Sequence, residues 1–78
     1  MPHIVVKLFA GRSEQQKIRL AGQIVKDVIA TLNCGEESVS VAFEEVKSQD
    51  WTEQVYKPDI KLKWDKLYKK PGYTVESL

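Results

Sequence analysis

The sequence predicts a small α/β protein with a β–α–β unit, because an amphipathic helix pattern lies between two strand patterns. The first strand pattern, HIVVKLF, covers His3–Phe9, and the second, SVSVAFEEV, covers residues 38–46. Strands joined by a helix pair in parallel, with a right-handed crossover connection. Because the chain has 78 residues, we expect one domain over residues 1–78.

The first strand pattern is a nearly continuous apolar run, which favours burial on both faces of the strand, under a helix or a partner. Ser13 and Gln16 then have the spacing of a capping box at a helix start. Apolar residues recur at helical spacing as far as Leu32, and Asn33 is a favourable residue for a helix end. A helix over about residues 14–32 is therefore expected.

The second strand pattern alternates, with Val39, Val41 and Phe43 on one face. The C-terminal part is less regular. Pro58 is a good first residue for a helix, and apolar residues follow it at helical spacing. We therefore expect a second helix from Pro58 to near Lys70.

Composition excludes several classes of function. The net charge of +1 argues against nucleic acid or an anionic membrane as the dominant partner. The chain contains no signal-peptide pattern and no apolar run near the roughly 20 residues that span a bilayer, so we expect a cytoplasmic protein. His3 is the only histidine and Cys34 the only cysteine. We therefore expect no metal site, no internal disulfide and no bound cofactor.

A chain of this size buries only about 60% of its unfolded surface. A sheet of two strands also leaves edges that another copy can cover. We therefore expect at least a homodimer, since closed two-fold symmetry is the commonest assembly.

Pro2 is the residue most suggestive of chemistry. If Met1 is removed, Pro2 carries a free secondary amine. An α-amino group titrates near 8, and burial or a nearby cation lowers its pKa further. Such an amine is suited to act as a general base at neutral pH. The alternative is a proline that only begins a strand, where a missing N–H donor costs little.

The stretch PHIVVKLFAGRSEQQK, in its β–α–β setting, resembles the 4-oxalocrotonate tautomerase superfamily. VYKPDI and KKPGY resemble its longer, PptA-type branch, whose members are usually dimers. The resemblance implies a cofactor-independent isomerase that acts on small enol or keto acids. It also implies that Pro2 is the catalytic base, that Arg12 binds a substrate carboxylate and that Trp51 forms a pocket wall.

Ser40 stands where the best-studied members of that superfamily have a second arginine. The resemblance therefore implies phenylenolpyruvate-like substrates rather than a dicarboxylate such as 2-hydroxymuconate. His3 adjoins Pro2 and is either a surface residue of the strand or a group that tunes the proline.

Pro2 and Arg12 are expected at opposite ends of one strand, roughly 23 Å apart. One site that uses both needs Arg12, together with Trp51, from a second subunit. Two alternatives remain open. One is a related hydratase or dehalogenase that uses protonated Pro2. The other is a non-catalytic homo-oligomeric module that uses its lysine-rich helix for contact.

Overall fold

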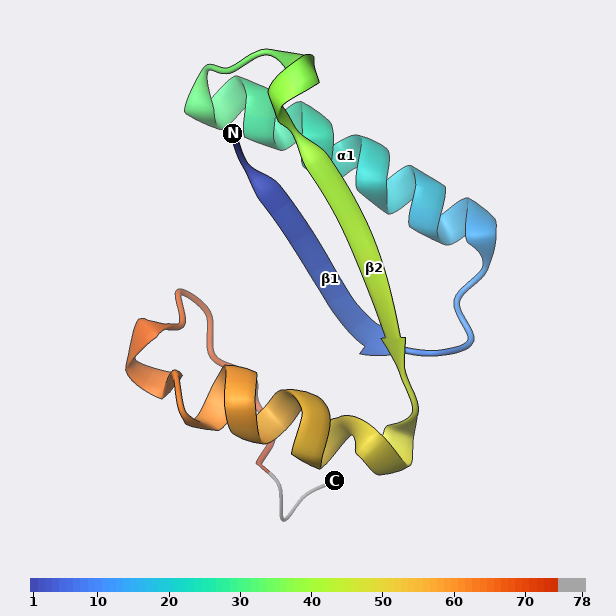
Figure 1. Ribbon diagram of the computed structural model, residues 1–78, viewed down its shortest axis with the longest axis vertical. Coiled ribbons are helices and arrows are strands. Elements are labelled where there is room, and N and C mark those ends of the chain that lie inside the picture. Colours follow the sequence, from blue (N-terminus) through green and yellow to red (C-terminus); the bar gives the residue numbers. More distant parts are fainter. Residues whose placement is uncertain (75–78) are drawn as a thin grey trace. The chain divides into compact units, whose positions relative to one another are not determined.

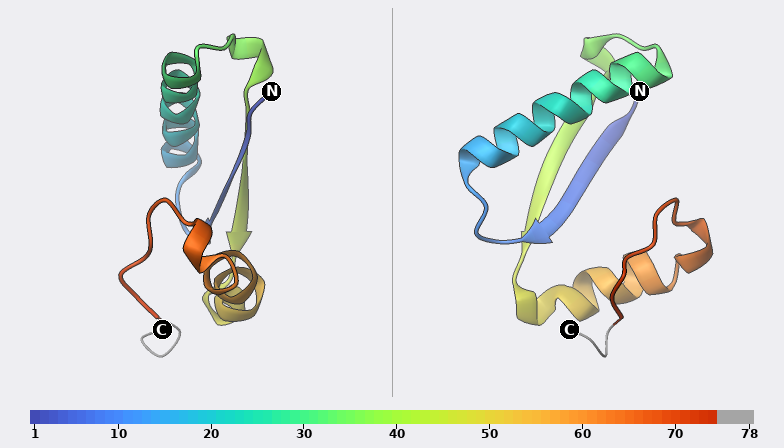
Figure 2. Two further views of the ribbon diagram at one scale, coloured as in Figure 1. Left: turned by 90° about the vertical axis from the view of Figure 1, so that its left-hand side faces the viewer. Right: turned by 180° about the vertical axis from the view of Figure 1, so that it is seen from behind.

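The computed structural model describes residues 1–74 and divides the chain into two compact units, Met1–Glu45 and Val46–Leu78. The first unit holds β1 (His3–Phe9), α1 (Glu14–Leu32) and nearly all of β2 (Ser40–Val46). The two strands form one parallel pair, and α1 is the connection between them (Figure 1). Figure 2 shows α1 lying along one face of this pair. The predicted β–α–β unit is confirmed.

The start and end of α1 follow the sequence signals. The Ser13 hydroxyl accepts a hydrogen bond from the N–H of Gln16 at 3.1 Å, and the Gln16 side chain accepts one from the N–H of Ser13 at 3.0 Å. This reciprocal pair is the predicted capping box. At the other end, Asn33 has a φ of 55°, and its N–H donates to the carbonyl of Ile29. A left-handed residue of this kind ends a helix.

Side chains of the strands alternate between two faces. Leu8, Val41 and Phe43 line the spaces beside α1, so they belong to the face that α1 covers. Two cross-strand pairs, His3 with Ser40 and Lys7 with Glu44, belong to the opposite face. Both pairs have the same register, which shows that β1 and β2 run together without a bulge between these positions. On this open face, the one that α1 does not cover, the cross-strand pairs therefore follow one another in order from the N-terminal ends of the two strands.

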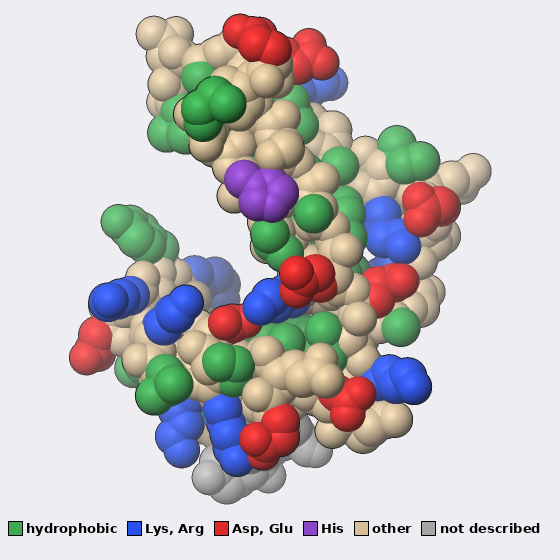
Figure 3. All heavy atoms as spheres, in the orientation of Figure 1, with side chains coloured by type: hydrophobic (Ala, Val, Ile, Leu, Met, Phe, Trp, Pro, Cys, Tyr) green, Lys and Arg blue, Asp and Glu red, His purple; other side chains and the backbone are tan. Residues whose placement is uncertain are grey.

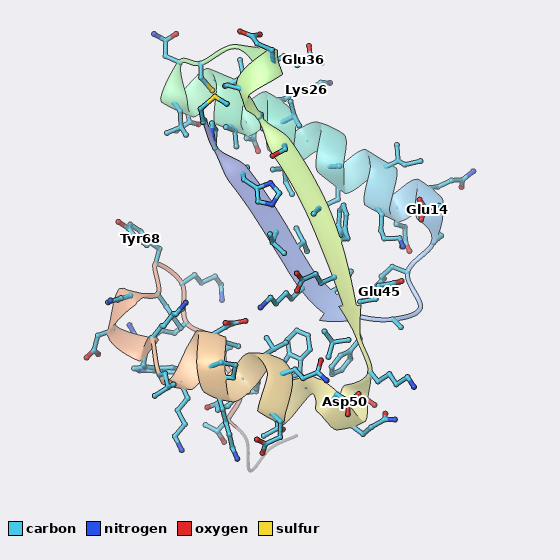
Figure 4. All side chains as sticks on the ribbon, viewed as in Figure 1. Glu14, Lys26, Glu36, Glu45, Asp50 and Tyr68 are labelled. Atoms are coloured by element: carbon cyan, nitrogen blue, oxygen red, sulfur yellow. The ribbon has the colours of Figure 1, made fainter. Side chains whose placement is uncertain are left out.

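Lys17 ties the first turn of α1 to the end of β2. Its amine lies 3.2 Å from a carboxylate oxygen of Glu14 and 3.5 Å from one of Glu45. Figure 4 labels both carboxylates at this end of the unit. The hydrogen bond to Glu14 is the main cause of a raised Lys17 pKa, and partial burial opposes it. The charged form of Lys17 is therefore favoured by the fold.

Burial of the first strand on both faces is not reached within the single chain, and cover of the second face by a partner stays a prediction. No residue of β1 is buried, and Val5 and Phe9 remain 41% and 46% exposed. The reason is that α1 covers only one face. No side chain anywhere in residues 1–45 is buried, so this unit has little core of its own.

The second unit is built on a π-helical segment, η3 (Thr52–Lys61). Its two buried side chains are Val55 and Tyr56. Tyr73 returns from the C-terminal part of the chain, and its ring centroid lies 5.8 Å from that of Tyr56. These aromatic contacts, with buried Val46, form the core of the unit.

The predicted helix from Pro58 to near Lys70 is misplaced. The helix begins before Pro58, which lies inside it, and residues beyond it form only a short turn, η4 (Trp64–Lys66). Burial of Val55 and Tyr56 fixes the start of the helix ahead of the proline. The helix has a wide turn, in which the N–H of Leu62 donates to the carbonyl of Lys57, five residues earlier. A proline within an ordinary α-helix would clash with the carbonyl four residues before it.

No helix within residues 1–74 has the length and apolar character needed to cross a membrane.

Candidate active site

Pro2 immediately precedes β1 and is half-buried. Its carbonyl accepts a hydrogen bond from the N–H of Ser40 at 3.2 Å, which fixes Pro2 to the first residue of β2. Met1, the residue ahead, is fully exposed. The hydrogen bond uses the carbonyl of Pro2 and leaves its nitrogen uninvolved, so replacing the Met1–Pro2 amide by a free amine need not disturb it.

His3 and Ser40 form a pair beside Pro2. The Nδ1 atom of His3 lies 2.6 Å from the Oγ atom of Ser40, and both residues are exposed. The histidine side chain is visible at the surface in Figure 3, where it is purple. The structure thus brings Ser40 to His3 and Pro2, which adjoin each other in the sequence. The sequence alone does not define a register for this contact, because the second strand pattern covers residues 38–46, whereas the strand begins at Ser40.

Arg12 lies in the loop between β1 and α1 and is exposed. Figure 1 shows the N-terminus at one end of β1 and this loop at the other. Pro2 and Arg12 of one chain are therefore separated by the length of a seven-residue strand, roughly 23 Å. Arg12 also borders a cavity of about 140 Å³ on the side of the sheet that α1 covers, lined further by Leu8, Gln16, Lys17, Leu20 and Phe43.

Trp51 belongs to the second unit, where it directly precedes η3 and is half-buried. Its indole N–H donates to the hydroxyl of Tyr73 at 3.0 Å. Tyr73 therefore holds the Trp51 ring in one orientation while its own ring packs near Tyr56. The sequence does not predict this hydrogen bond between Trp51 and Tyr73, because the only signal for Tyr73 is its place in the KKPGY segment.

Within residues 1–74, histidine, cysteine and acidic side chains form no group of three or more that could hold a metal ion. Cys34 is half-buried and has a free thiol. Beside Pro2, the contacts described above involve Ser40, which donates to the Pro2 carbonyl, and His3, which contacts Ser40.

Comparison with known proteins identifies the family of this chain. The family model described as "Tautomerase enzyme" matches residues 2–55. A "Probable tautomerase" from Xylella fastidiosa (strain 9a5c) is 45% identical over 73 residues, which cover 94% of this chain and 89% of that protein. "Tautomerase PptA" from Enterobacter sp. (strain 638) is 41% identical over 76 residues, which cover 96% of this chain and 100% of that protein. "Tautomerase PptA" from Escherichia coli (strain K12 / DH10B) is 35% identical over 78 residues, again with nearly complete cover of both chains. The chain therefore belongs to the tautomerase enzyme family, and it is an isomerase.

Proposed function

We propose that this tautomerase acts without a cofactor on 2-hydroxy-2-enoates of the phenylenolpyruvate type, with Pro2 as its general base. The observation that carries the proposal is the position of Pro2. It lies one residue from the N-terminus, and its carbonyl is already bound to Ser40. Removal of the exposed Met1 would give a secondary amine in a fixed place.

The reaction moves one proton. The Pro2 nitrogen takes the proton of the 2-hydroxyl group, and the electron pair of that O–H bond forms the C2=O bond. The electron pair of the C2=C3 double bond then takes up the proton at C3, which Pro2 returns. Atoms and electrons balance without an oxidant or reductant. An α-amino group titrates near neutral pH, as proton transfer of this kind requires.

We further propose that the site is shared between two subunits of a homodimer. Arg12 is separated from Pro2 by the length of β1, so a second chain has to supply the arginine that binds the substrate carboxylate. Trp51 of that second chain would provide an apolar wall. The absence of any buried side chain in residues 1–45 supports association, since exposed apolar surface gains free energy when covered. Both units of the chain then act as one functional domain.

An aryl substrate fits the charge of the site better than a dicarboxylate. Ser40 is uncharged, and the pair next along the open face is Val5 and Ala42 by the register of β1 and β2. A second carboxylate would find no arginine on this part of the strands, whereas an aromatic ring would find aliphatic side chains.

The decisive experiment begins with intact mass spectrometry, which establishes that Met1 has been removed. Phenylenolpyruvate ketonisation is then followed for the unmodified chain and for Pro2→Ala, which retains a primary amine. We expect kcat to fall at least about tenfold, because the ring fixes the amine and general base catalysis contributes about 10²–10⁴-fold. An unchanged kcat would show that Pro2 is not the base.

The hydratase alternative is distinguished in the same samples. A protonated Pro2 would favour hydration of a 3-haloacrylate over ketonisation, whereas a basic Pro2 would favour ketonisation. The names of the relatives support the second outcome, and they also support an enzyme rather than a non-catalytic module.

A further inference from the structure

The contact between His3 and Ser40 is short and lies at the end of the sheet where Pro2 is held. The Nδ1 to Oγ distance is 2.6 Å, and the N–H of the same serine donates to the Pro2 carbonyl. Both side chains are exposed, so a small molecule can reach them. The pair belongs to the open face of the sheet, opposite the face that α1 covers.

Hydrogen counting shows what this pair offers to a substrate. A neutral imidazole carries one N–H, and a serine hydroxyl carries one O–H. The bond between the two side chains uses one of these hydrogens, whichever way it points. One hydrogen is therefore left to donate outward, either from the Ser40 hydroxyl or from the far nitrogen of His3. This conclusion does not depend on the tautomer of the ring.

A keto–enol reaction needs such a donor. When the 2-hydroxyl group loses its proton to Pro2, negative charge develops on the 2-oxygen. Donors fixed in advance around a developing oxyanion lower the barrier. The backbone N–H of Ser40 already donates to the Pro2 carbonyl, which leaves the side chains of the pair as donors next to the proline.

We propose that the His3–Ser40 pair donates the hydrogen bond that stabilises the 2-oxygen of the substrate during proton transfer to Pro2. The proposal rests on the proposed function, since it assigns the oxyanion donor of that reaction. The two residues act as a unit: one donates, and the other orients it through the 2.6 Å contact.

Four single variants and one double variant test this assignment by phenylenolpyruvate ketonisation, after mass spectrometry has established a free Pro2. Ser40→Ala and His3→Phe each remove the pair, and we expect kcat to fall about tenfold to a hundredfold with little change in KM. Ser40→Thr keeps a hydroxyl, and His3→Asn keeps a nitrogen near the Nδ1 position, so both should retain most of the activity. The double variant Ser40→Ala/His3→Phe should be no worse than the poorer single variant.

Two controls separate chemistry from folding. Ser38→Ala removes another serine hydroxyl of the same connection, one that donates to the carbonyl of Gly35 at 2.9 Å, and should leave kcat unchanged. Inhibition by cinnamate, which has the aryl ring and carboxylate but no 2-oxygen, should be equally strong in Ser40→Ala and the unmodified chain. A purely structural role of the pair would weaken cinnamate binding and lower the Tm together with kcat.

The outcomes are distinguishable. If the unmodified chain with a free Pro2 has no activity above the buffer rate, the proposed function is wrong and this inference falls with it. If that chain is active while Ser40→Ala keeps its full kcat, only the inference is wrong. Losses that multiply in the double variant would also overturn it, because independent residues do not form one donor.

Discussion

At the scale of single residues, the charge at position 40 is expected to affect substrate choice in the proposed site. Ser40 is neutral, is exposed and lies beside Pro2. We expect Ser40→Arg to shift the ratio of kcat/KM from phenylenolpyruvate toward 2-hydroxymuconate by about one to two powers of ten, since a charge-assisted hydrogen bond contributes about 1.5–3 kcal/mol. A side-by-side assay of both substrates with both proteins measures the shift. A preference for 2-hydroxymuconate in the unmodified chain would mean that another cation binds the second carboxylate.

Lys17 gives a second prediction at this scale. Hydrogen bonding to Glu14 raises the Lys17 pKa above its usual value of 10.5. A raised lysine pKa stabilises the fold fully below pH 10.5, and this stabilisation is lost as the pH rises through the folded-state pKa. Lys17→Met should therefore lower the Tm by a few degrees at pH 8, with a smaller difference at pH 11.

The matched control for Lys17 is Lys26→Met. Lys26 lies on the same helix, is exposed and is labelled in Figure 4. We expect this variant to leave the Tm nearly unchanged at both pH values. Equal shifts in the two variants would mean that net charge, rather than the contacts of Lys17 with Glu14 and Glu45, sets the effect. The measurement is thermal unfolding followed by circular dichroism, at one protein concentration.

At the scale of elements, α1 depends on its first turn. Ser13→Ala removes the acceptor for the N–H of Gln16 and breaks the capping box. We expect the free energy of unfolding to fall by about 1 kcal/mol, as measured by urea titration. Gln15→Ala, an exposed change in the same turn, is the control and should cost much less. If both variants lose the same stability, the cap is not what holds this end of the helix.

The elements also show why sequence reasoning succeeds in one half of the chain and fails in the other. β1, α1 and β2 have local signals, namely strand patterns, a capping box and a left-handed Asn33, and these signals match the structure. The second helix has a strong local signal at Pro58 that is overridden by burial of Val55 and Tyr56. The ring of Tyr56 packs near that of Tyr73, a residue far along the chain that no local pattern connects to it.

Predicting the site required local sequence signals and also contacts between residues that are far apart in the chain. The separation of Pro2 from Arg12 follows from the length of one strand, so sequence alone was sufficient. The contact of His3 with Ser40 depends on the register of two strands that are far apart in the sequence. Composition and spacing do not define that register, although the strand starts at positions 3 and 40 are consistent with it.

At the scale of the whole molecule, the first unit is an incomplete structure by itself. Within the described residues, each strand of its two-stranded sheet has one unpaired edge. Its large apolar side chains with 40% or more exposure are Met1, Val5, Phe9, Ile18, Leu20 and Leu32. Unpaired strand edges and exposed apolar side chains favour association. A second copy that pairs with this unit in the antiparallel direction would bring its own loop between β1 and α1 toward Pro2. Assembly and catalysis would then depend on the same contact.

This coupling leads to a complementation experiment. Pro2→Ala and Arg12→Ala should each have little activity alone as homodimers, because each lacks one residue at both sites. A hybrid dimer has one site with both residues and one with neither. Random exchange in an equal mixture makes half of the dimers hybrid, so about a quarter of the unmodified activity should return if the assembly is a closed two-fold dimer. Native mass spectrometry measures the hybrid fraction.

A mixture of Pro2→Ala with the double variant Pro2→Ala/Arg12→Ala is the control. It should recover no activity, because no chain in it supplies the base. If hybrids form and the first mixture also stays inactive, Pro2 and Arg12 do not act on one substrate from two chains, and the shared site is wrong.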